Sequence, residues 1–317
     1  MSITRQEGFI RKVLYSFWVE TTRLILPSQL GETQMSVVDI DRRYRLAYEE
    51  FVRDYLFPSK PVIITGALPG WRALDNWTPD YFRHRYGAKN LAIDGKKYKM
   101  ADFIDRVNSS TSENPAPYLR NAVIDQFLPE LLADIDPLPQ YFFPNWLDGK
   151  LSLVLRSRLH DGSPELYIGG AGAKFPFLHF DSYHTHAFLT QIYGIKAYTA
   201  FSEDQSPLIY VDPHQYNASQ IPDVENPDLD KFPLFAKAVP MRFQLHPGEI
   251  LFIPGGLWHT AKMLTPSISI SVNRANASNW STLTHDMCTH APLHMKPLAA
   301  AYLTGIRAFR TLLGSRT

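Results

Sequence analysis

His179 and Asp181 stand two residues apart in the aromatic-rich run FPFLHFDSYHTHAFLTQIYGIKAYTAF, residues 175–201. Side chains at positions i and i+2 of an extended strand share one face. The imidazole and the carboxylate are therefore predicted to point the same way, and Phe180 between them to point away into packing. A second histidine from elsewhere in the chain would complete a 2-His-1-carboxylate triad, which binds non-haem Fe(II) and leaves coordination positions open.

The run HPGEILFIPGGLWHTAKM, residues 246–263, offers this second histidine. Ile250, Phe252 and Pro254 alternate along a predicted strand, a Gly-Gly turn follows, and His259 comes just beyond the strand end. Most of the 11 histidines in the chain are expected to be structural. A polar residue next to an apolar strand is seldom there by chance, however, and a histidine at this position can reach the mouth of a barrel. We predict His259 as the third ligand.

Short extended runs dominate the chain from Tyr118 onward, separated by Gly, Pro, Asp or His turns. This pattern is typical of a β-barrel or sandwich. The predicted strands are YLRNAV, LSLVLRS, PELYIGG, FPFLHFD, AFLTQIYG, IKAYTAFS, MRFQLHPG, EILFIPG and SISISVN. Residues 204–240 contain a long insertion rich in Pro, Asp and Asn, and a loop of that length is usually functional, often a lid or a substrate-binding loop.

The segment before these strands is predicted to be mainly helical. Apolar residues at near-helical spacing predict a helix over residues 8–26, either packed on the domain or forming a dimerisation or membrane-surface helix. The other predicted elements are a helix over 39–56, a buried strand at 62–65, a helix over 80–86 with Thr78 as N-cap, a hairpin around Asp94-Gly95 and a short helix over 100–108.

Residues 108–117 are rich in Ser, Thr, Asn and Pro and form the predicted linker. We therefore expect a helical and α/β flank over residues 1–117, packed on a barrel core over residues 118–280, and C-terminal helices over residues 281–317. Apolar residues at helical spacing predict the last helix over residues 296–314. It would dock on the core or form the interface of a homodimer.

Composition excludes few functions. Of the 317 residues, 45% are hydrophobic and 20% are charged, as in ordinary globular proteins. The net charge of +1 gives no bulk field for nucleic acid or an anionic membrane, so neither partner is expected. Cys288 is the single cysteine and can form no internal disulfide. The first residues lack the pattern of a signal peptide, so we expect a cytoplasmic protein.

Three blocks together resemble the jumonji-C branch of Fe(II)/2-oxoglutarate-dependent oxygenases. They are the His-Phe-Asp triplet at 179–181, the run QIYGIK at 191–196, and the run from Pro-Gly-Glu to Trp-His at 247–259. The resemblance extends over roughly residues 60–280, and it is closest in style to the small asparaginyl-hydroxylase-like members. It implies a mainly β fold with flanking helices, a double-stranded β-helix (cupin or jelly-roll) barrel with the metal inside. It also implies Fe(II), 2-oxoglutarate as co-substrate and O2.

Three residues match positions that contact 2-oxoglutarate in this family. Lys196 matches the base that binds the far carboxylate, and a buried ammonium is tolerable only with an anionic partner. Tyr118 matches a tyrosine that supports the same carboxylate, although a core aromatic with a satisfied hydroxyl is an equal alternative. Asn273 matches an asparagine near the iron-bound end. It ends the run SISISVN, in which alternation predicts the serines and Asn273 on the lumen face.

Two departures from the family pattern concern the co-substrate. Pro176 stands where several relatives have a hydroxyl residue, and proline cannot make that hydrogen bond. Lys196 follows His179 by 17 positions, two more than in the asparaginyl-hydroxylase type, which puts Ala187 where an asparagine often faces the co-substrate.

Neighbouring polar residues could replace the missing contacts. Thr185 and Thr190 are predicted co-substrate contacts. If the two extra residues bulge nearby, Thr185 and His186 could take the place of the missing asparagine. Gln191 is expected to line the pocket with Thr190. His184 and His186 are predicted to lie at most in the surroundings of the metal or the substrate, rather than to bind the metal.

The resemblance implies oxidative decarboxylation of 2-oxoglutarate to succinate and CO2, coupled to hydroxylation of a substrate C–H bond. A protein or peptide side chain is the leading predicted substrate. The alternatives are a small-molecule or amino-acid hydroxylase in biosynthesis, an N-methyl-lysine demethylase, and a non-catalytic cupin that binds a ligand or partner. The single cysteine offers no zinc-finger-like reader module, and a tRNA hydroxylase would need a more basic surface.

Overall fold

The computed structural model describes residues 39–68, 70–147, 162–290 and 296–312 of the chain. Val37–Thr317 form one compact unit. The helix predicted over residues 8–26 and the strand predicted over residues 151–157 lie outside the described residues.

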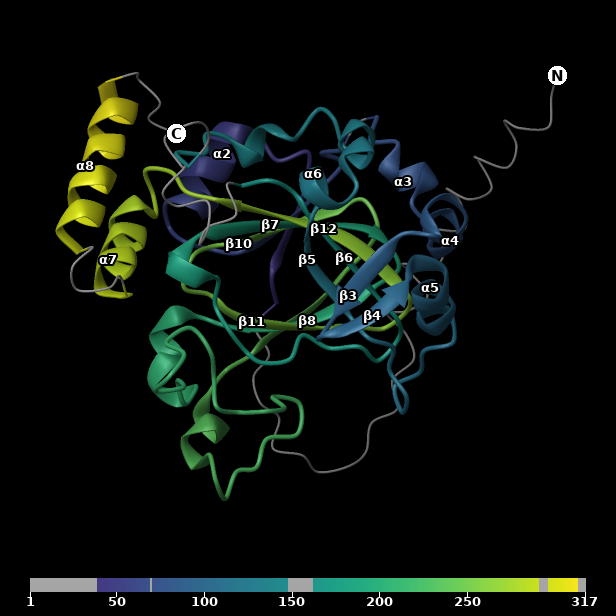
Figure 1. Cartoon of the computed structure of the whole chain (residues 1–317). Coiled ribbons are helices and arrows are strands. Elements are labelled where there is room, and N and C mark those ends of the chain that lie inside the picture. Colours follow the sequence, from purple (N-terminus) through teal and green to yellow (C-terminus); the bar gives the residue numbers. More distant parts are fainter. Residues whose placement is uncertain (1–38, 69, 148–161, 291–295, 313–317) are drawn as a thin grey trace. The chain divides into compact units, whose positions relative to one another are not determined.

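Two β-sheets form the centre of this unit (Figure 1). In the described residues, the larger sheet has the strand order β1-β2-β10-β7-β12-β6-β5, and a smaller sheet has the order β11-β8-β9. The strands of the larger sheet are β1 (Asp41–Tyr44), β2 (Val62–Thr65), β5 (Leu119–Val123), β6 (Glu165–Gly169), β7 (His186–Tyr193), β10 (Glu249–Ile253) and β12 (Ser267–Arg274). Those of the smaller sheet are β8 (Lys196–Phe201), β9 (Met241–Leu245) and β11 (Trp258–Met263). This mainly β architecture with flanking helices confirms the predicted fold class.

Alternation along β12 shows why these sequences form two-sided strands. Ile268, Ile270 and Val272 are fully buried in the largest hydrophobic core, and the serines between them lie on the opposite face, as predicted. The strand pairs antiparallel with both β6 and β7. The larger sheet is therefore apolar on one face and has a row of small polar residues on the other.

The largest core lies between the apolar face of this sheet and the preceding helices. Phe188 and Phe252 from the sheet pack around Phe51, with ring centroids 6.0 and 5.0 Å from the Phe51 ring. The flanking elements are α2 (Tyr48–Phe51), a π-helical turn (Val52–Leu56), α3 (Ala73–Asn76), α4 (Pro79–Tyr86), α5 (Met100–Asn108), α6 (Ile124–Phe127) and the hairpin of β3 (Asn90–Ile93) and β4 (Lys96–Lys99).

Several local predictions for this flank are confirmed. The hydroxyl of Thr78 accepts a hydrogen bond from Tyr81 N at 3.1 Å and caps α4, with Pro79 in the first turn. Asp94 and Gly95 have φ values of 48° and 78° at the tip of the hairpin, as the turn dipeptide requires.

The single helix predicted over residues 39–56 is wrong in its first part. Asp41–Tyr44 form β1, which pairs in parallel with Val62–Thr65. Side chains along β1 alternate between half-buried and exposed, which is a strand pattern rather than a helical one. Since β1 and β2 join the same sheet as later strands, the flank shares a sheet with the core, and the domain boundaries at 117/118 and 280/281 stay predictions.

The insertion packs on the outer face of the smaller sheet, below β8 and β11 in Figure 1. Its short 3-10 helices are Glu203–Leu208 and Pro233–Lys237. Phe201 and Trp258 from the smaller sheet share a hydrophobic cluster with residues of the insertion, namely Ile209, Ile221, Val224, Phe232 and Phe235. The insertion is therefore anchored by a core of its own.

Two helices end the described chain, α7 (Trp280–His290) and α8 (Lys296–Leu312), which confirms the predicted C-terminal helix apart from its last residues. The structure describes the backbone of α8 but not the apolar side chains that predicted this helix. Among the described residues, no helix has the length and apolar character needed to cross a membrane.

Candidate metal centre and co-substrate cavity

His179 and His259 are brought together by main-chain hydrogen bonds. His179 N donates to His259 O at 3.1 Å, and His259 N donates to His179 O at 2.6 Å. Residues 175–181 do not form the continuous strand that was predicted, because bends at Pro176 and Phe177 interrupt the pairing and proline has no N–H to donate. His259 lies beyond the end of β10, as predicted, and is the second residue of β11.

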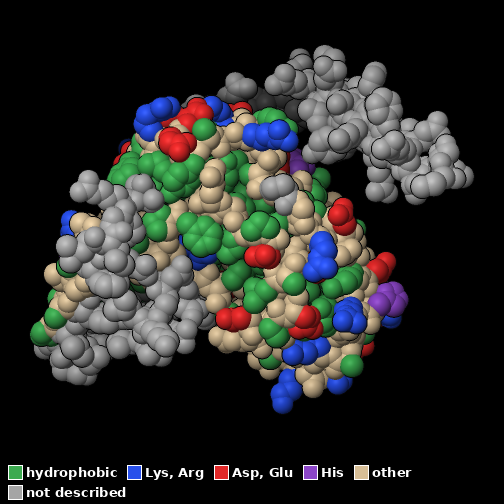
Figure 2. Space-filling model, turned by 90° about the horizontal axis from the view of Figure 1, so that it is seen from above, with side chains coloured by type: hydrophobic (Ala, Val, Ile, Leu, Met, Phe, Trp, Pro, Cys, Tyr) green, Lys and Arg blue, Asp and Glu red, His purple; other side chains and the backbone are tan. Residues whose placement is uncertain are grey.

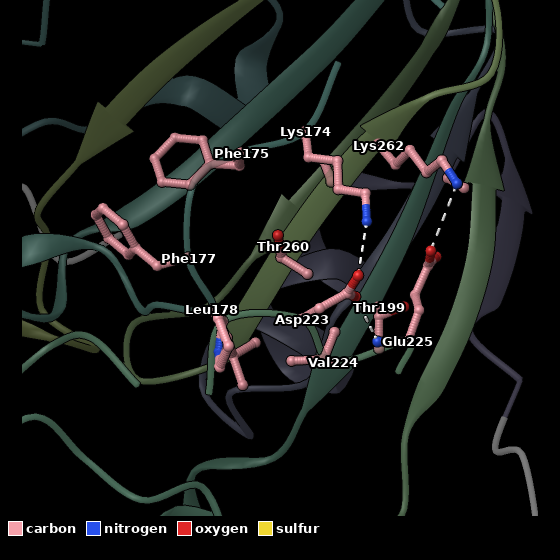
Figure 3. A pocket seen from close by; sticks show the side chains of 13 residues that line it. Lys174, Phe175, Phe177, Leu178, Thr199, Asp223, Val224, Glu225, Thr260 and Lys262 are labelled. Carbon is pink, nitrogen blue, oxygen red and sulfur yellow. Dashed lines mark hydrogen bonds and ion pairs between the residues drawn. The ribbon is translucent and has the colours of Figure 1, made fainter. Parts of the chain in front are cut away.

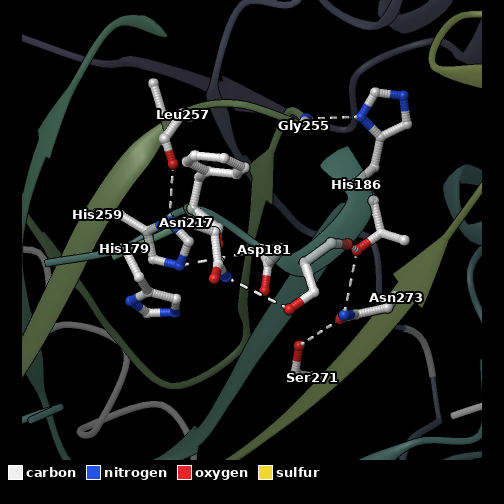
Figure 4. A network of polar contacts seen from close by, with 12 residues as sticks. His179, Asp181, His186, Asn217, Gly255, Leu257, His259, Ser271 and Asn273 are labelled. Atoms are coloured by element: carbon white, nitrogen blue, oxygen red, sulfur yellow. Dashed lines mark hydrogen bonds and ion pairs between the residues drawn. The ribbon is translucent and has the colours of Figure 1, made fainter. Parts of the chain in front are cut away.

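The three predicted metal ligands converge (Figure 4). One ligand atom from each of His179, Asp181 and His259 lies within 4.8 Å of the other two. His259 Nε2 is 3.9 Å from Asp181 Oδ2, and the two imidazole centroids are 4.4 Å apart. Phe180 is buried in the opposite direction, against Trp258, as the spacing predicted.

Hydrogen bonds to carbonyl groups orient both imidazoles. His259 Nδ1 is 2.9 Å from Leu257 O, and His179 Nδ1 is 3.4 Å from Phe177 O. A carbonyl can only accept, so each Nδ1 carries the proton and each Nε2 keeps its lone pair for a metal. Phe175 stacks on the His179 ring at 4.1 Å and 13°, which holds that ring in place.

Burial favours the uncharged forms of His179 and Asp181 in the protein alone. It lowers the pKa of His179 well below its usual value, and the neighbouring His259 adds to this. Burial raises the pKa of Asp181, while His259 opposes the shift. Asp181 Oδ2 is buried and has no hydrogen-bond partner among the described residues. A divalent cation would supply the missing partner of this carboxylate, so the residues fit a metal ion.

Lys196 lies in the same cavity and is also buried, with 1% of its surface exposed. Its ammonium donates to Ser269 Oγ at 2.5 Å and to the hydroxyl of Tyr118 at 3.4 Å. Burial lowers the pKa of Lys196 to about 7. Within the part of the chain that the structure describes, no carboxylate lies within ion-pair distance of this lysine. A small dicarboxylate would provide that partner.

A cavity between the inner faces of the two sheets joins the lysine to the three metal ligands. It encloses about 430 Å³ of empty space, counting its open mouth. It is lined by Tyr118, Tyr167, Phe175, His179, Asp181, Ala187, Leu189, Lys196, Tyr198, His259, Ala261 and Ser271. Tyr118 and Lys196 therefore line one cavity, as predicted. Ala187 also lines it, at the position where the spacing from Lys196 placed it.

Thr190 does not join this cavity, contrary to its predicted role. Ala187 and Leu189 line the cavity, so Thr190 lies on the opposite face of β7, paired with Ile250 and Ile270 of the neighbouring strands. Its hydroxyl is buried without a hydrogen-bond partner among the described residues. The strand period therefore excludes Thr190 from co-substrate contact in this structure.

Thr185 and Asn273 bond to each other next to the cavity. Asn273 Nδ2 is 3.4 Å from Thr185 Oγ1, and Ser271 Oγ, which lines the cavity, is 3.4 Å from Asn273 Oδ1. Their contact with a co-substrate stays a prediction. Gln191 bonds to Tyr193 O and Gly194 O at the strand end and is not among the cavity-lining residues.

The two additional histidines lie away from the metal centre. His184 Nδ1 pairs with Asp286 at 2.5 Å, and His186 bonds to Ser278 Oγ at 2.8 Å and accepts from Gly255 N at 3.0 Å. Burial lowers the pKa of His184, but its hydrogen bonds to Asp286 and Glu203 outweigh this and raise it to about 9. A tight turn forms over Ser182–His184, and Tyr183 and His184 in it have positive φ values. This turn lies within the stretch from His179 to Lys196, which is two residues longer than in the asparaginyl-hydroxylase type.

The outer face of the smaller sheet has a second pocket, between β8, β11 and the insertion (Figure 3). Lys174 pairs with Asp223 at 2.9 Å, and Lys262 pairs with Glu225 at 3.5 Å. These ion pairs hold the insertion beside residues 175–181, which we call the metal-ligand segment. On the face shown in Figure 2, basic and acidic side chains are interspersed with hydrophobic ones.

Comparison with known proteins places the chain in a family. The model of the cupin-like domain matches residues 48–275. Lysine-specific demethylase 8 of Danio rerio is 33% identical over 250 residues, covering 74% of this chain and 57% of that protein. Lysine-specific demethylase JMJ30 of Arabidopsis thaliana is 31% identical over 263 residues, covering 77% of this chain and 56% of that protein. tRNA wybutosine-synthesizing protein 5 of Gallus gallus is 26% identical, covering 71% and 73%.

The fold and the site define a cupin-type oxygenase. The chain belongs to the cupin-like, jumonji-C family of Fe(II)/2-oxoglutarate-dependent oxygenases, which use Fe(II), 2-oxoglutarate and O2. The chain spans little more than half the length of the two demethylases.

Some residues of the site were not predicted from the sequence. Ser269 bonds Lys196, and its signal was the alternation of SISISVN, which predicted a polar lumen face without naming this serine. Phe175 stacks on His179, a contact that spacing alone does not show. Asn217 lies beside the metal centre in Figure 4 and comes from the insertion, in which no motif or spacing pointed to it.

Proposed function

We propose that this oxygenase oxidises a C–H bond on a protein or peptide side chain, and that an N-methyl group on a basic side chain is the favoured target. The supporting observation is one cavity with a three-ligand set at one end and, at the other, a buried lysine that has no carboxylate partner among the described residues. The names of two relatives, both lysine-specific demethylases, favour the methylated side chain. Hydroxylation of an unmodified side chain, the leading prediction from sequence, is the second candidate and uses the same chemistry.

His179, Asp181 and His259 would bind Fe(II) through their unprotonated nitrogens and the free carboxylate oxygen. When bound, the iron and 2-oxoglutarate supply the oxidising chemistry, with one atom of O2 going to the C–H bond and the other to succinate. The work of the chain is to orient these ligands through their Nδ1 hydrogen bonds and to exclude water from a buried cavity.

Lys196, with Ser269 and Tyr118 beside it, would bind the far carboxylate of 2-oxoglutarate. The ammonium gains an anionic partner, which no described residue provides, and the carboxylate gains donors in a low-dielectric site. This arrangement orients the co-substrate along the cavity toward the metal ligands.

The test incubates purified protein with Fe(II), 2-oxoglutarate and a peptide panel that contains unmodified and N-methylated lysine and arginine. Succinate is measured by NMR, formaldehyde by derivatisation, and peptide mass by mass spectrometry. Demethylation gives formaldehyde and a peptide without the methyl group, whereas hydroxylation adds one oxygen atom and gives no formaldehyde. Asp181→Ala is the control for metal-dependent turnover. Succinate without any change in peptides would favour a small-molecule substrate, and metal binding without turnover would favour a binding protein.

Two further properties remain proposals. A homodimer through the terminal helices would be tested by light scattering on the purified chain. A cytoplasmic location would be tested by fractionation of cells that express the tagged protein.

A further inference from the structure

The metal-ligand segment has a second neighbour besides β11, namely residues 216–219 of the insertion. The main-chain groups of His179 bond to His259 in β11, while those of Leu178 and Phe180 face the other way. Ser219 N donates to Leu178 O at 2.9 Å, and Phe180 N donates to Asn217 O at 3.2 Å. The segment therefore lies between β11 and the insertion, with alternate residues bonded to each side.

The side chain of Asn217 also contacts this segment. Its Nδ2 donates to Phe180 O at 2.8 Å, and lies 3.3 Å from Ser182 Oγ. The side chain is buried, with 8% of the residue exposed. The main-chain carbonyl of Asn217 accepts from Phe180 N, so this one residue binds the peptide groups on both sides of Phe180. Those two peptides connect His179 to Asp181.

We propose that Asn217 is a positioning residue of the metal centre, which fixes the peptide entering Asp181 and thereby the direction of its carboxylate. Within the described part of the chain, the carboxylate of Asp181 has no hydrogen bond to orient it, and its Oδ2 is buried. The main chain is therefore what sets where that oxygen points. The imidazoles differ in this respect, because each is oriented by its own bond from Nδ1.

This inference rests on the metal centre of the proposed function, and it gives the insertion a role at the site. The ion pairs of Lys174 with Asp223 and of Lys262 with Glu225, together with the hydrophobic cluster behind Phe180, hold the insertion against the smaller sheet. A segment anchored in this way can present Asn217 at a constant position. The insertion then acts as a brace for the ligand segment rather than as a lid.

The test compares Asn217→Ala with Ser219→Ala by titration of the metal-free protein with Mn(II) in a calorimeter. Ser219 is a matched control, because it is buried in the same insertion and, among the described residues, its hydroxyl bonds to Ile209 O and Ile221 N within that insertion. Partners that orient metal ligands typically contribute 10- to 100-fold in affinity, so we expect Asn217→Ala to weaken Mn(II) binding by about 10-fold or more. Ser219→Ala is expected to bind as the wild type does.

Circular dichroism and metal-free melting temperatures check that both variants are folded at the titration temperature. If Asn217→Ala does not fold, Asn217→Ser retains a polar side chain but cannot reach Phe180 O, and the same loss of affinity is expected. Wild-type affinity in a folded Asn217 variant, or an equal loss in Ser219→Ala, would overturn the inference. Failure of the wild type itself to bind Mn(II) would instead overturn the metal centre and the proposed function.

Discussion

The two ends of the cavity are built in different ways. At the lysine end, Lys196 begins β8 of the smaller sheet and Ser269 belongs to β12 of the larger sheet, so two regular strands hold these residues on facing sides of the cavity. At the metal end, His179 and Asp181 lie in a segment without regular strand structure, bonded to β11 on one side and to the insertion on the other. Regular strands and the packing of the two sheets therefore position the lysine end, while the metal end depends on hydrogen bonds to a segment without regular strand structure.

Removal of a metal ligand should have the largest effect on binding, and it should disable the metal end of the cavity. Asp181→Ala is expected to weaken Mn(II) binding by more than about 100-fold, since even partners of metal ligands contribute 10- to 100-fold. Calorimetric titration measures this. Full 2-oxoglutarate decarboxylation by the variant would refute the assignment of the metal centre.

Lys196→Met should disable only the lysine end. We expect the Kd for 2-oxoglutarate to rise about 10- to 100-fold, because a charged hydrogen-bonded partner is lost, while Mn(II) affinity stays unchanged. The apo protein should melt at a higher temperature, because a buried ammonium is replaced by an apolar side chain. Titration of the Mn(II)-loaded variant with 2-oxoglutarate decides between this result and an equal loss at both ends.

The pH dependence of co-substrate binding follows from the same lysine. Burial lowers the pKa of Lys196 to about 7, so the free protein loses this positive charge as the pH rises above that value. Binding of the far carboxylate then requires proton uptake, and affinity should fall by up to about tenfold per pH unit. Titrations from pH 6.5 to 8.5 measure the slope. Lys196→Arg should remove it, because the guanidinium stays protonated; an equal slope in that variant would exclude Lys196 as its source.

The turn that follows Asp181 should show a pH dependence of stability. Hydrogen bonds to Asp286 and Glu203 outweigh burial and raise the pKa of His184 to about 9. This stabilisation is fully present below the unfolded pKa of about 6.5 and is lost as the pH rises through 9. His184→Gln should lower the free energy of unfolding by about 2 kcal/mol at pH 6 and by far less above pH 9. Urea unfolding measures both; a difference that does not depend on pH would contradict the ion pair.

The smallest effect is expected at Thr190, on the face of β7 that points away from the cavity. Its buried hydroxyl has no partner among the described residues, so Thr190→Val should stabilise the protein by up to about 1 kcal/mol. The Kd for 2-oxoglutarate should remain within about twofold of the wild type, since the side chain is outside the cavity. A large loss of co-substrate affinity would restore the predicted role of Thr190.

The sequence by itself determined the chemistry of the site and the faces of its strands. The spacing of two between His179 and Asp181 and the alternation of SISISVN depend on local period, which is a property of the backbone, and the strand and turn before His259 predicted the third ligand. The cavity-facing positions of Lys196 and Tyr118 followed from the family resemblance.

Only the tertiary structure decided how the metal end is held. Asp41–Tyr44 form a strand because they pair with β2, and the face on which Thr190 lies depends on the register of β7 with its neighbours. Asn217 is 36 positions from Asp181, in an insertion without periodicity. Its contact with Phe180 depends on where the insertion packs, which long-range burial decides and local sequence does not encode.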